Sequence, residues 1–267
     1  DFVGKAVRRK GSQKFGNTIA GNPTFDNSFI YYQDGWSTTH LIATRATGAA
    51  TLYRIFTTYL TSAFTSGTTV SVATTSNFDD PTGTIEINGD DIAYTGTTAT
   101  TFTGASGRAK EHPAFSLVNQ FDSLGTTNMP DGRHGIYFAV LGDTCLIAGL
   151  NGSGSTTDGA TVSAVTMGDA RAMYATVYHQ RVYGANTTSG TQMRMWFSDV
   201  GSVTSWNANN FVDITDDLEE QITGFAVGKG DVLGIFKPNS IHVYNEIQLR
   251  QTLRGVGAYN HRVIQKI

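Results

Sequence analysis

The sequence predicts an all-β fold, and three observations support it. Helical periodicity is almost absent, and the best helical candidate, residues 217–222, supports one turn at most. Short runs of Val, Ile, Tyr, Phe and Thr, bounded by Gly, Asn and Asp, recur along the whole chain, which is typical of strands and turns. Only 15% of the 267 residues are charged, whereas exposed helices need Glu, Lys and Arg on their solvent faces.

The composition also excludes several classes of protein. With 39% hydrophobic residues the chain is too apolar to be disordered, and its length allows a sizeable core. The net charge of -3 produces no global basic field for nucleic acid. One cysteine excludes a scaffold stapled by internal disulfides. No apolar run reaches the roughly 18 residues of a membrane span, so we expect no such span.

A weak internal repeat divides the strands into units. The first unit has strands at 29–32, 40–44 and 51–56, and the second has strands at 135–140 and 145–149 before a Gly/Ser-rich loop. The third has strands at 173–178, 181–185 and 193–198, and the fourth at 222–227, 231–236 and 240–244. A meander of this size cannot bury both faces alone, and radial stacking of meanders makes a β-propeller. The pattern therefore favours a partial, incomplete β-propeller, with a β-sandwich as the alternative.

A Thr-rich segment interrupts this repeat. Residues 61–113 hold 14 of the 38 Thr residues and contain alternating strands at 69–73, 84–87 and 91–95. An insertion whose ends lie close together in a surface loop costs little stability. We therefore expect a first blade region at 1–60, an inserted small β module at 61–113, and further blades at 114–267.

The two ends of the chain carry a further expectation. The first residue is Asp1 rather than Met, and residues 253–264 look like the first strand of another blade. Since propellers often have more than four blades, we expect the ring to be closed by residues outside this chain or by a partner chain.

None of the candidate catalytic residues indicates an enzyme. The acidic residues Asp216, Asp217, Glu219 and Glu220 are clustered, but in a hydrophilic stretch, so a solvated loop is favoured over a glycosidase pair. Cys145 lies in a strand-like run without an adjacent base and is expected to be a buried small side chain rather than a nucleophile.

Metal and cofactor motifs are also missing from the sequence. The histidines show no spacing typical of metal ligands, which favours ordinary turn and half-buried positions; they are His40, His112, His134, His179, His242 and His261. No EF-hand loop, P-loop or Gly-x-Ser-x-Gly elbow occurs, so we expect no cofactor. The stretch from Ser198 to Trp206 is similar to the Asp-box turn of sialidase propellers, although Asp199 directly follows Ser198. That box is a structural turn rather than a catalytic motif.

The start of the chain is basic. Arg8, Arg9 and Lys10 lie among the first fifteen residues, in which Asp1 is the only acidic residue. A solvated terminus is the ordinary interpretation. The functional alternative is contact with DNA in a channel or with an acidic neighbour, and phosphate contact would make binding fall steeply with salt.

Several stretches together resemble the blade series of bacteriophage structural propellers. They are residues 177–185, 195–201, 205–206, 210–214, 222–225 and 232–241, the last containing the Phe-Lys-x-x-Ser-Ile hairpin at 236–241. Residues 8–15 look like the entry of that family's first blade, and 68–72 with 93–104 resemble a small module that recurs in phage virion proteins.

This resemblance implies a structural virion protein of the phage tail, of the tail hub, nozzle or head–tail connector kind. Such a protein acts by contacts with other tail or connector proteins, in a homo-oligomeric ring around the DNA channel. The alternative is a glycan-binding or glycan-cleaving propeller at the tail tip. Trp36, Trp196 and Trp206 would then stack on sugar rings, although core packing is favoured for these side chains.

Overall fold

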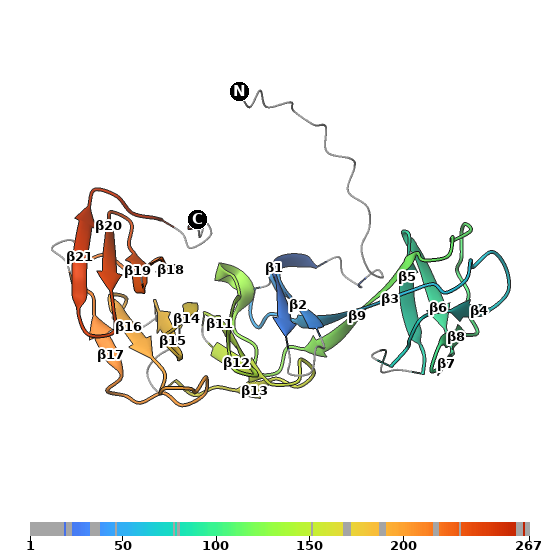
Figure 1. The fold of residues 1–267 in the computed structure, drawn as a ribbon, viewed down its shortest axis with the longest axis horizontal. Coiled ribbons are helices and arrows are strands. Elements are labelled where there is room, and N and C mark those ends of the chain that lie inside the picture. The colour runs from blue at the N-terminus through green and yellow to red at the C-terminus, as the bar shows by residue number, and fades with distance from the viewer. Residues whose placement is uncertain are drawn as a thin grey trace, which may run out of the picture. The chain divides into compact units, whose positions relative to one another are not determined.

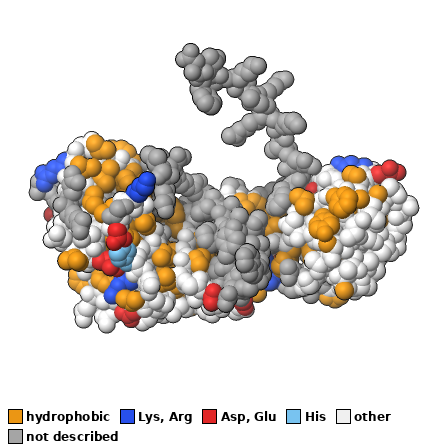
Figure 2. Space-filling model, viewed as in Figure 1, with side chains coloured by type: hydrophobic (Ala, Val, Ile, Leu, Met, Phe, Trp, Pro, Cys, Tyr) orange, Lys and Arg blue, Asp and Glu red, His pale blue; other side chains and the backbone are white. Residues whose placement is uncertain are grey.

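A computed structural model describes residues 19, 23–32, 38–45, 47–76, 78, 81–150, 152–167, 172–186, 191–215, 219–229, 231–259 and 264. Over these residues the chain forms 21 strands and one short 3-10 helix, η1 (Gly132–His134). The all-β prediction is therefore confirmed. Figure 2 shows few charged side chains on the viewed face, in line with the low charge of the sequence.

The chain divides into two compact units. We call Ile55–Asp122 the Thr-rich unit, and Pro23–Arg54 together with Ser123–Ile267 the repeat unit. The division falls within two long strands, β3 (Leu52–Tyr59) and β9 (Leu117–Gly125). The domain boundaries expected at 60/61 and 113/114 stay a prediction.

Three four-stranded antiparallel sheets follow one another in the repeat unit, each with its strands in chain order (Figure 1). The first contains β10 (Tyr137–Leu141), β11 (Thr144–Gly149), β12 (Gly152–Thr156) and β13 (Ser163–Ala164). The second contains β14 (Tyr174–Tyr178), β15 (Arg181–Ala185), β16 (Arg194–Phe197) and β17 (Phe211–Asp213). The third contains β18 (Gly224–Gly228), β19 (Val232–Phe236), β20 (Ser240–Tyr244) and β21 (Leu249–Arg254).

The remaining strands form two sheets. One has the order β1-β2-β3-β9-β5-β6, with β1 (Thr24–Tyr32), β2 (Thr38–Arg45), β5 (Gly83–Ile87) and β6 (Asp90–Tyr94). The other, in the Thr-rich unit, has the order β4-β8-β7, with β4 (Thr69–Ser71), β7 (Gly96–Thr98) and β8 (Thr101–Thr103). The strands expected from alternating residues in both units are confirmed. Their ends differ from the expected ones by at most two residues, except that β1 begins five residues before 29 and β3 ends three residues after 56.

The first strands of successive sheets in the repeat unit lie side by side. β1 packs beside β10, β10 beside β14, and β14 beside β18. β10, β14 and β18 line one elongated hollow with Phe138–Val140, Ala175–Val177 and Phe225–Val227, and Ile264 completes its lining. Each four-stranded sheet therefore presents its first strand to the same interior space.

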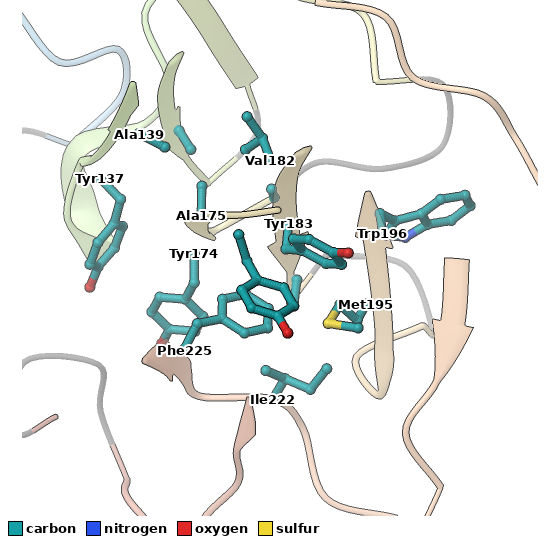
Figure 3. Packing of buried hydrophobic residues seen from close by; sticks show 14 of the residues in the cluster. Tyr137, Ala139, Tyr174, Ala175, Val182, Tyr183, Met195, Trp196, Ile222 and Phe225 are labelled. Carbon is teal, nitrogen blue, oxygen red and sulfur yellow. The ribbon is translucent and has the colours of Figure 1, made fainter. Parts of the chain in front are cut away.

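One apolar core continues through these three sheets (Figure 3). Tyr137 of β10 meets Tyr174 of β14 edge to face, with ring centroids 5.2 Å apart. Phe225 of β18 is buried in the same cluster. Burying a side chain of this size stabilises a fold by about 1.5–3 kcal/mol. Since single sheets cannot cover both of their faces, the shared core makes the three sheets depend on one another.

The prediction of a Gly/Ser-rich loop after Gly149 is wrong, because Gly152–Thr156 forms strand β12. Its small residues are required by close backbone packing. A Cβ on Gly154 would lie 2.6 Å from the carbonyl oxygen of Asn128, and one on Gly149 would lie 3.0 Å from the ring of Pro130. Small residues therefore mark a buried strand here rather than a flexible connection.

The prediction for 253–264 is also wrong over the described residues. Leu253 and Arg254 belong to β21, where they pair with Ile241 and Ser240 of β20. They complete the last described sheet instead of opening another, and 255–259 lie outside any strand. The helical turn expected at 217–222 falls partly outside the described residues, and 219–222 contain no helix.

Candidate functional site

Several residues singled out in the sequence lie outside the described part of the chain. They are Arg8, Arg9, Lys10, Trp36, Asp216, Asp217 and His261. The DNA or partner contact expected of the basic start therefore stays a prediction.

The two described tryptophans are core residues. Trp196 is 5% exposed and packs in the core of the repeat unit, which leaves no open ring face for the alternative of sugar stacking. Trp206 packs against the same core, and its Nε1 donates to the carbonyl oxygen of Val203 at 2.8 Å. The favoured core packing is confirmed for both.

Cys145 is fully buried in β11, as expected. Burial raises the pKa of its thiol to about 12, because desolvation disfavours the thiolate. A thiol held neutral is a poor nucleophile.

Two described acidic residues of 213–220, Asp213 and Glu220, bind neighbouring segments. Asp213 forms a two-point ion pair with Arg194, which lowers the pKa of the Asp213 carboxyl. Glu220 accepts a hydrogen bond from the backbone N–H of Asn239 at 2.9 Å. These carboxylates hold strands and turns together, which supports a structural role for the segment.

The stretch that is similar to an Asp-box forms a loop organised by Asp199. Its carboxylate accepts hydrogen bonds from Ser205 Oγ at 2.6 Å and from Asn210 Nδ2 at 2.8 Å. These two bonds hold the pKa of Asp199 below its usual range. The turn is structural, as expected.

A second hollow, of about 750 Å³, lies where hairpins of the second and third sheets of the repeat unit end. Its volume is in the range of small-ligand sites. We call it the His179 hollow, and it is lined by His179, Gln180, Arg181, Tyr183, Phe197, Val200, Tyr244, Glu246 and Ile247. Figure 2 shows histidine, acidic and basic side chains gathered over the part of the molecule that holds these sheets.

The hairpin between β14 and β15 provides the first edge of the hollow. Tyr178 pairs with Arg181, so His179 and Gln180 form a two-residue turn. Both have positive φ, 46° and 55°, as in a type I′ turn. That turn favours Asn-Gly, and a larger side chain in the left-handed region costs about 1–2 kcal/mol. The contacts of His179 offset part of this cost.

His179 bridges two carboxylates of the neighbouring sheet. Its Nε2 contacts Asp231 Oδ1, and its Nδ1 lies 2.9 Å from Glu246 Oε2. An imidazole that faces an acceptor at each nitrogen donates to both only when protonated. The hydrogen bond to Asp231, with that to Glu246, raises the pKa of His179. The bridge therefore joins two adjacent sheets through a charged histidine.

Aromatic and basic side chains form the floor of the hollow. Tyr183 and Tyr244 are buried, and burial raises the pKa of each phenol. The hydroxyl of Tyr244 donates to the carbonyl oxygen of Glu246 at 2.9 Å, which fixes the segment after β20. Arg181 lies over the ring of Phe197 at 5.2 Å and donates to the carbonyl oxygen of Ser198 at 2.7 Å.

Sequence reasoning placed His179 in a turn correctly but missed this cluster. His179 is 52 residues from Asp231 and 67 from Glu246, so no local motif brings them together. The repeat contained a signal, because the β14–β15 and β18–β19 turns occupy equivalent positions in successive meanders. Equivalent turns lie at the same end of neighbouring sheets.

Two further histidines have buried side chains. His242 lies buried in β20 between Ser240 Oγ and Thr252 Oγ1, each 3.0 Å from a ring nitrogen. His112 is buried in the Thr-rich unit. Among the residues that the structure describes, no group of three or more His, Cys, Asp or Glu side chains is placed to hold a metal ion. No helix in the described ranges is long and apolar enough to cross a membrane.

Comparisons with known proteins give one weak likeness. No protein-family model and no curated protein matches the chain. Two similar solved structures are Kluyveromyces lactis Hsv2 and the same protein with loop 6CD replaced by a Gly-Ser linker. Each is 11% identical with a TM-score of 0.33, and the match covers 88% of this chain and 100% of that chain. A likeness at this score carries no argument about fold or function.

Proposed function

We propose that this chain is a structural protein of a bacteriophage tail, of the hub, nozzle or head–tail connector kind, built as a partial β-propeller. In this proposal it acts through contacts with copies of itself and with other virion proteins, in a ring around the DNA channel. The resemblance of its strands to phage structural propellers supports the virion assignment.

The arrangement of first strands carries the architectural part of the proposal. Four meanders follow one another along the chain, and their first strands β1, β10, β14 and β18 are neighbours in that order. Propeller blades have this order, with one strand of each blade facing a central channel. The hollow between β10, β14 and β18 corresponds to a sector of such a channel.

Exposed apolar side chains on the last sheet support a protein partner. β21 pairs only with β20 among the described strands, so no described strand covers its outer edge. Leu249 and Leu253 of β21 are exposed, and Tyr259 beyond it is 80% exposed. An unpaired strand edge with apolar side chains is a template for pairing with another chain. A second copy of this chain, docked on that edge, would extend the ring.

Mass spectrometry of purified virions, with the copy number per particle, tests the virion assignment. The proposal predicts that the protein is present at a copy number that fits a ring, such as twelve, six or three. Absence from the particle, or a copy number below three, would overturn it.

The expected DNA contact of Arg8, Arg9 and Lys10 has its own test. Replacing all three by Gln should lower the slope of log K against log salt by about 0.9 for each phosphate that is no longer neutralised. An unchanged slope would show that these three residues do not neutralise DNA phosphates. It would not affect the virion assignment.

A further inference from the structure

We propose that the His179 hollow is a binding site for a neutral carbohydrate. It contains a shaped space, an apolar wall and polar groups without internal partners, and none of these features is explained by a role in holding sheets together.

Charge balance around the hollow determines the class of ligand. The cation His179 is matched by Asp231 and Glu246. The other cation, Arg181, lies near Asp199, whose carboxylate is held by Ser205 and Asn210. With Asp199 counted, three carboxylates surround the two cations, so no net positive charge favours an anionic ligand. Both carboxylates at His179 are engaged, which disfavours a cationic ligand. A neutral polar molecule fits this balance.

Polar groups that remain available match hydroxyl groups. The side-chain amide of Gln180 has no hydrogen-bond partner within the described residues and offers both a donor and an acceptor. Arg181 uses one Nη for Ser198, and its other N–H groups face no partner in the described ranges. Glu246 Oε1 has only a long contact, 3.5 Å, with the Tyr183 hydroxyl. Hydroxyls of a sugar both donate and accept, and so can satisfy all three.

Apolar side chains line the same hollow. Val200 is 60% exposed and Ile247 is 87% exposed, and both line the hollow together with Phe197. Exposed apolar side chains beside a concave polar surface are typical of binding sites. A pyranose presents an apolar C–H face and a polar hydroxyl rim, which matches this division of the hollow.

The bridge makes His179 a positioning residue. It holds Glu246, and the turn that contains it orients Gln180. His179, Gln180 and Glu246 all have positive φ, so their side chains point into the hollow only while this strained backbone is retained.

Titration of methyl-labelled protein with neutral saccharides tests the proposal. The probes are glucose, galactose, mannose, N-acetylglucosamine and their disaccharides, with sialyllactose as an anionic comparison. At least one neutral probe should shift the methyl signals of Val200 and Ile247 saturably, while sialyllactose should not bind more tightly than lactose. Absence of saturable shifts for every neutral probe, or tighter binding of the anionic probe, would overturn the proposal.

Variants identify the site. The double change His179→Asn and Gln180→Gly installs the pair that this turn prefers, so the hairpin is retained while the imidazole of His179 and the amide of Gln180 are removed. It should weaken binding by about tenfold or more. Val200→Ser should weaken binding by about threefold to tenfold. Val256→Ser is the matched control, because Val256 is 58% exposed and lies outside the hollow. Equal affinities for the wild type and the double variant would refute the site.

Discussion

The Thr-rich unit and the repeat unit place a histidine next to carboxylates in opposite environments. In the Thr-rich unit His112 has no exposed surface, and its Nε2 lies 3.2 Å from Asp90 Oδ2 without a well-directed hydrogen bond. In the repeat unit a third of the His179 side chain is exposed, and both of its nitrogens face carboxylates. Burial lowers the pKa of His112, whereas Asp231 and Glu246 raise that of His179. Histidine is thus a neutral, buried side chain in the Thr-rich unit and a charged bridge between sheets in the repeat unit.

The hydrophobic cores of the two units also differ, in how far each one extends. The core of the Thr-rich unit is local, and its aromatic centre consists of Phe102 packed on Phe78 and Tyr94 at 5.1 and 4.7 Å. The main core of the repeat unit continues across three sheets. Loss of a core side chain in the Thr-rich unit should therefore destabilise that unit alone. Loss of one in the repeat unit should destabilise all three of its four-stranded sheets.

The largest expected effect comes from truncating the local core. Phe102→Ala should destabilise the Thr-rich unit by about 3–5 kcal/mol, because it removes a fully buried ring and leaves a cavity. Hydrogen exchange should show faster exchange in β4–β8 and unchanged protection in β14–β21. Ile235→Ala is the matched variant, and it should raise exchange in all three sheets of the repeat unit. If the increase in exchange reached equally distant sheets in both variants, the two cores would not differ in extent.

A smaller effect is expected at Lys237, in the turn between β19 and β20. The side chain is fully buried, and its Nζ donates to the carbonyl oxygen of Ile214 at 2.6 Å. Lys237→Met keeps the length of the side chain but removes the donor. It should cost about 1–3 kcal/mol, because the carbonyl loses a buried partner. Urea unfolding measures this cost, and a stability equal to that of the wild type would show that the bond contributes nothing.

The pH dependences of the two units should have opposite signs. The pKa of His112 lies below its ordinary 6.5 in the folded state, so the unfolded chain binds the proton more tightly. The Thr-rich unit should therefore lose stability as the pH falls below 6.5. The pKa of His179 lies above 6.5, so its stabilisation is complete below that pH and is lost as the pH rises through the folded-state pKa.

Thermal unfolding followed by methyl signals of each unit, between pH 5 and 8, measures both slopes (a window of about 1.5 units on either side of the ordinary histidine pKa). His112→Gln should flatten the acid slope of the Thr-rich unit alone. His179→Asn should flatten the alkaline slope of the repeat unit alone. Slopes of the same sign in the two units would contradict the comparison.

The smallest effect is expected at a surface pair. Arg194 binds Asp213 at two points and lies 3.6 Å from the centroid of Phe211. Arg194→Lys keeps the charge but removes the planar guanidinium, so the repeat unit should be destabilised by about 1 kcal/mol or less. Chemical denaturation at low and high salt checks this expectation, and a destabilisation above about 2 kcal/mol would show a coupled network.

Alternation of apolar and polar residues was enough to predict most strands of the meanders. It failed at β12 because Gly152 and Gly154 are small for a reason that lies elsewhere in the chain, the backbone at Asn128 and Pro130. It failed at Leu253 because a terminal strand and an opening strand have the same pattern, and only the pairing with Ile241 distinguishes them.

The candidate site was less predictable than the fold. The pattern around His179 predicted a turn, but the turn's function depends on Asp231 and Glu246, which reach it only through the packing of one sheet on the next. The tryptophans were the visible signal for sugar stacking, and the described ones are packed in the core. Local patterns identified the elements, and contacts between sheets determined which residues meet.

Cryo-electron microscopy of the purified protein, alone and with its virion neighbours, tests whether it forms the proposed ring. The proposal predicts a closed ring in which β1, β10, β14 and β18 face one axial channel and β21 contacts a neighbouring chain. Particles without a ring, or a ring in which these first strands face away from the channel, would contradict it.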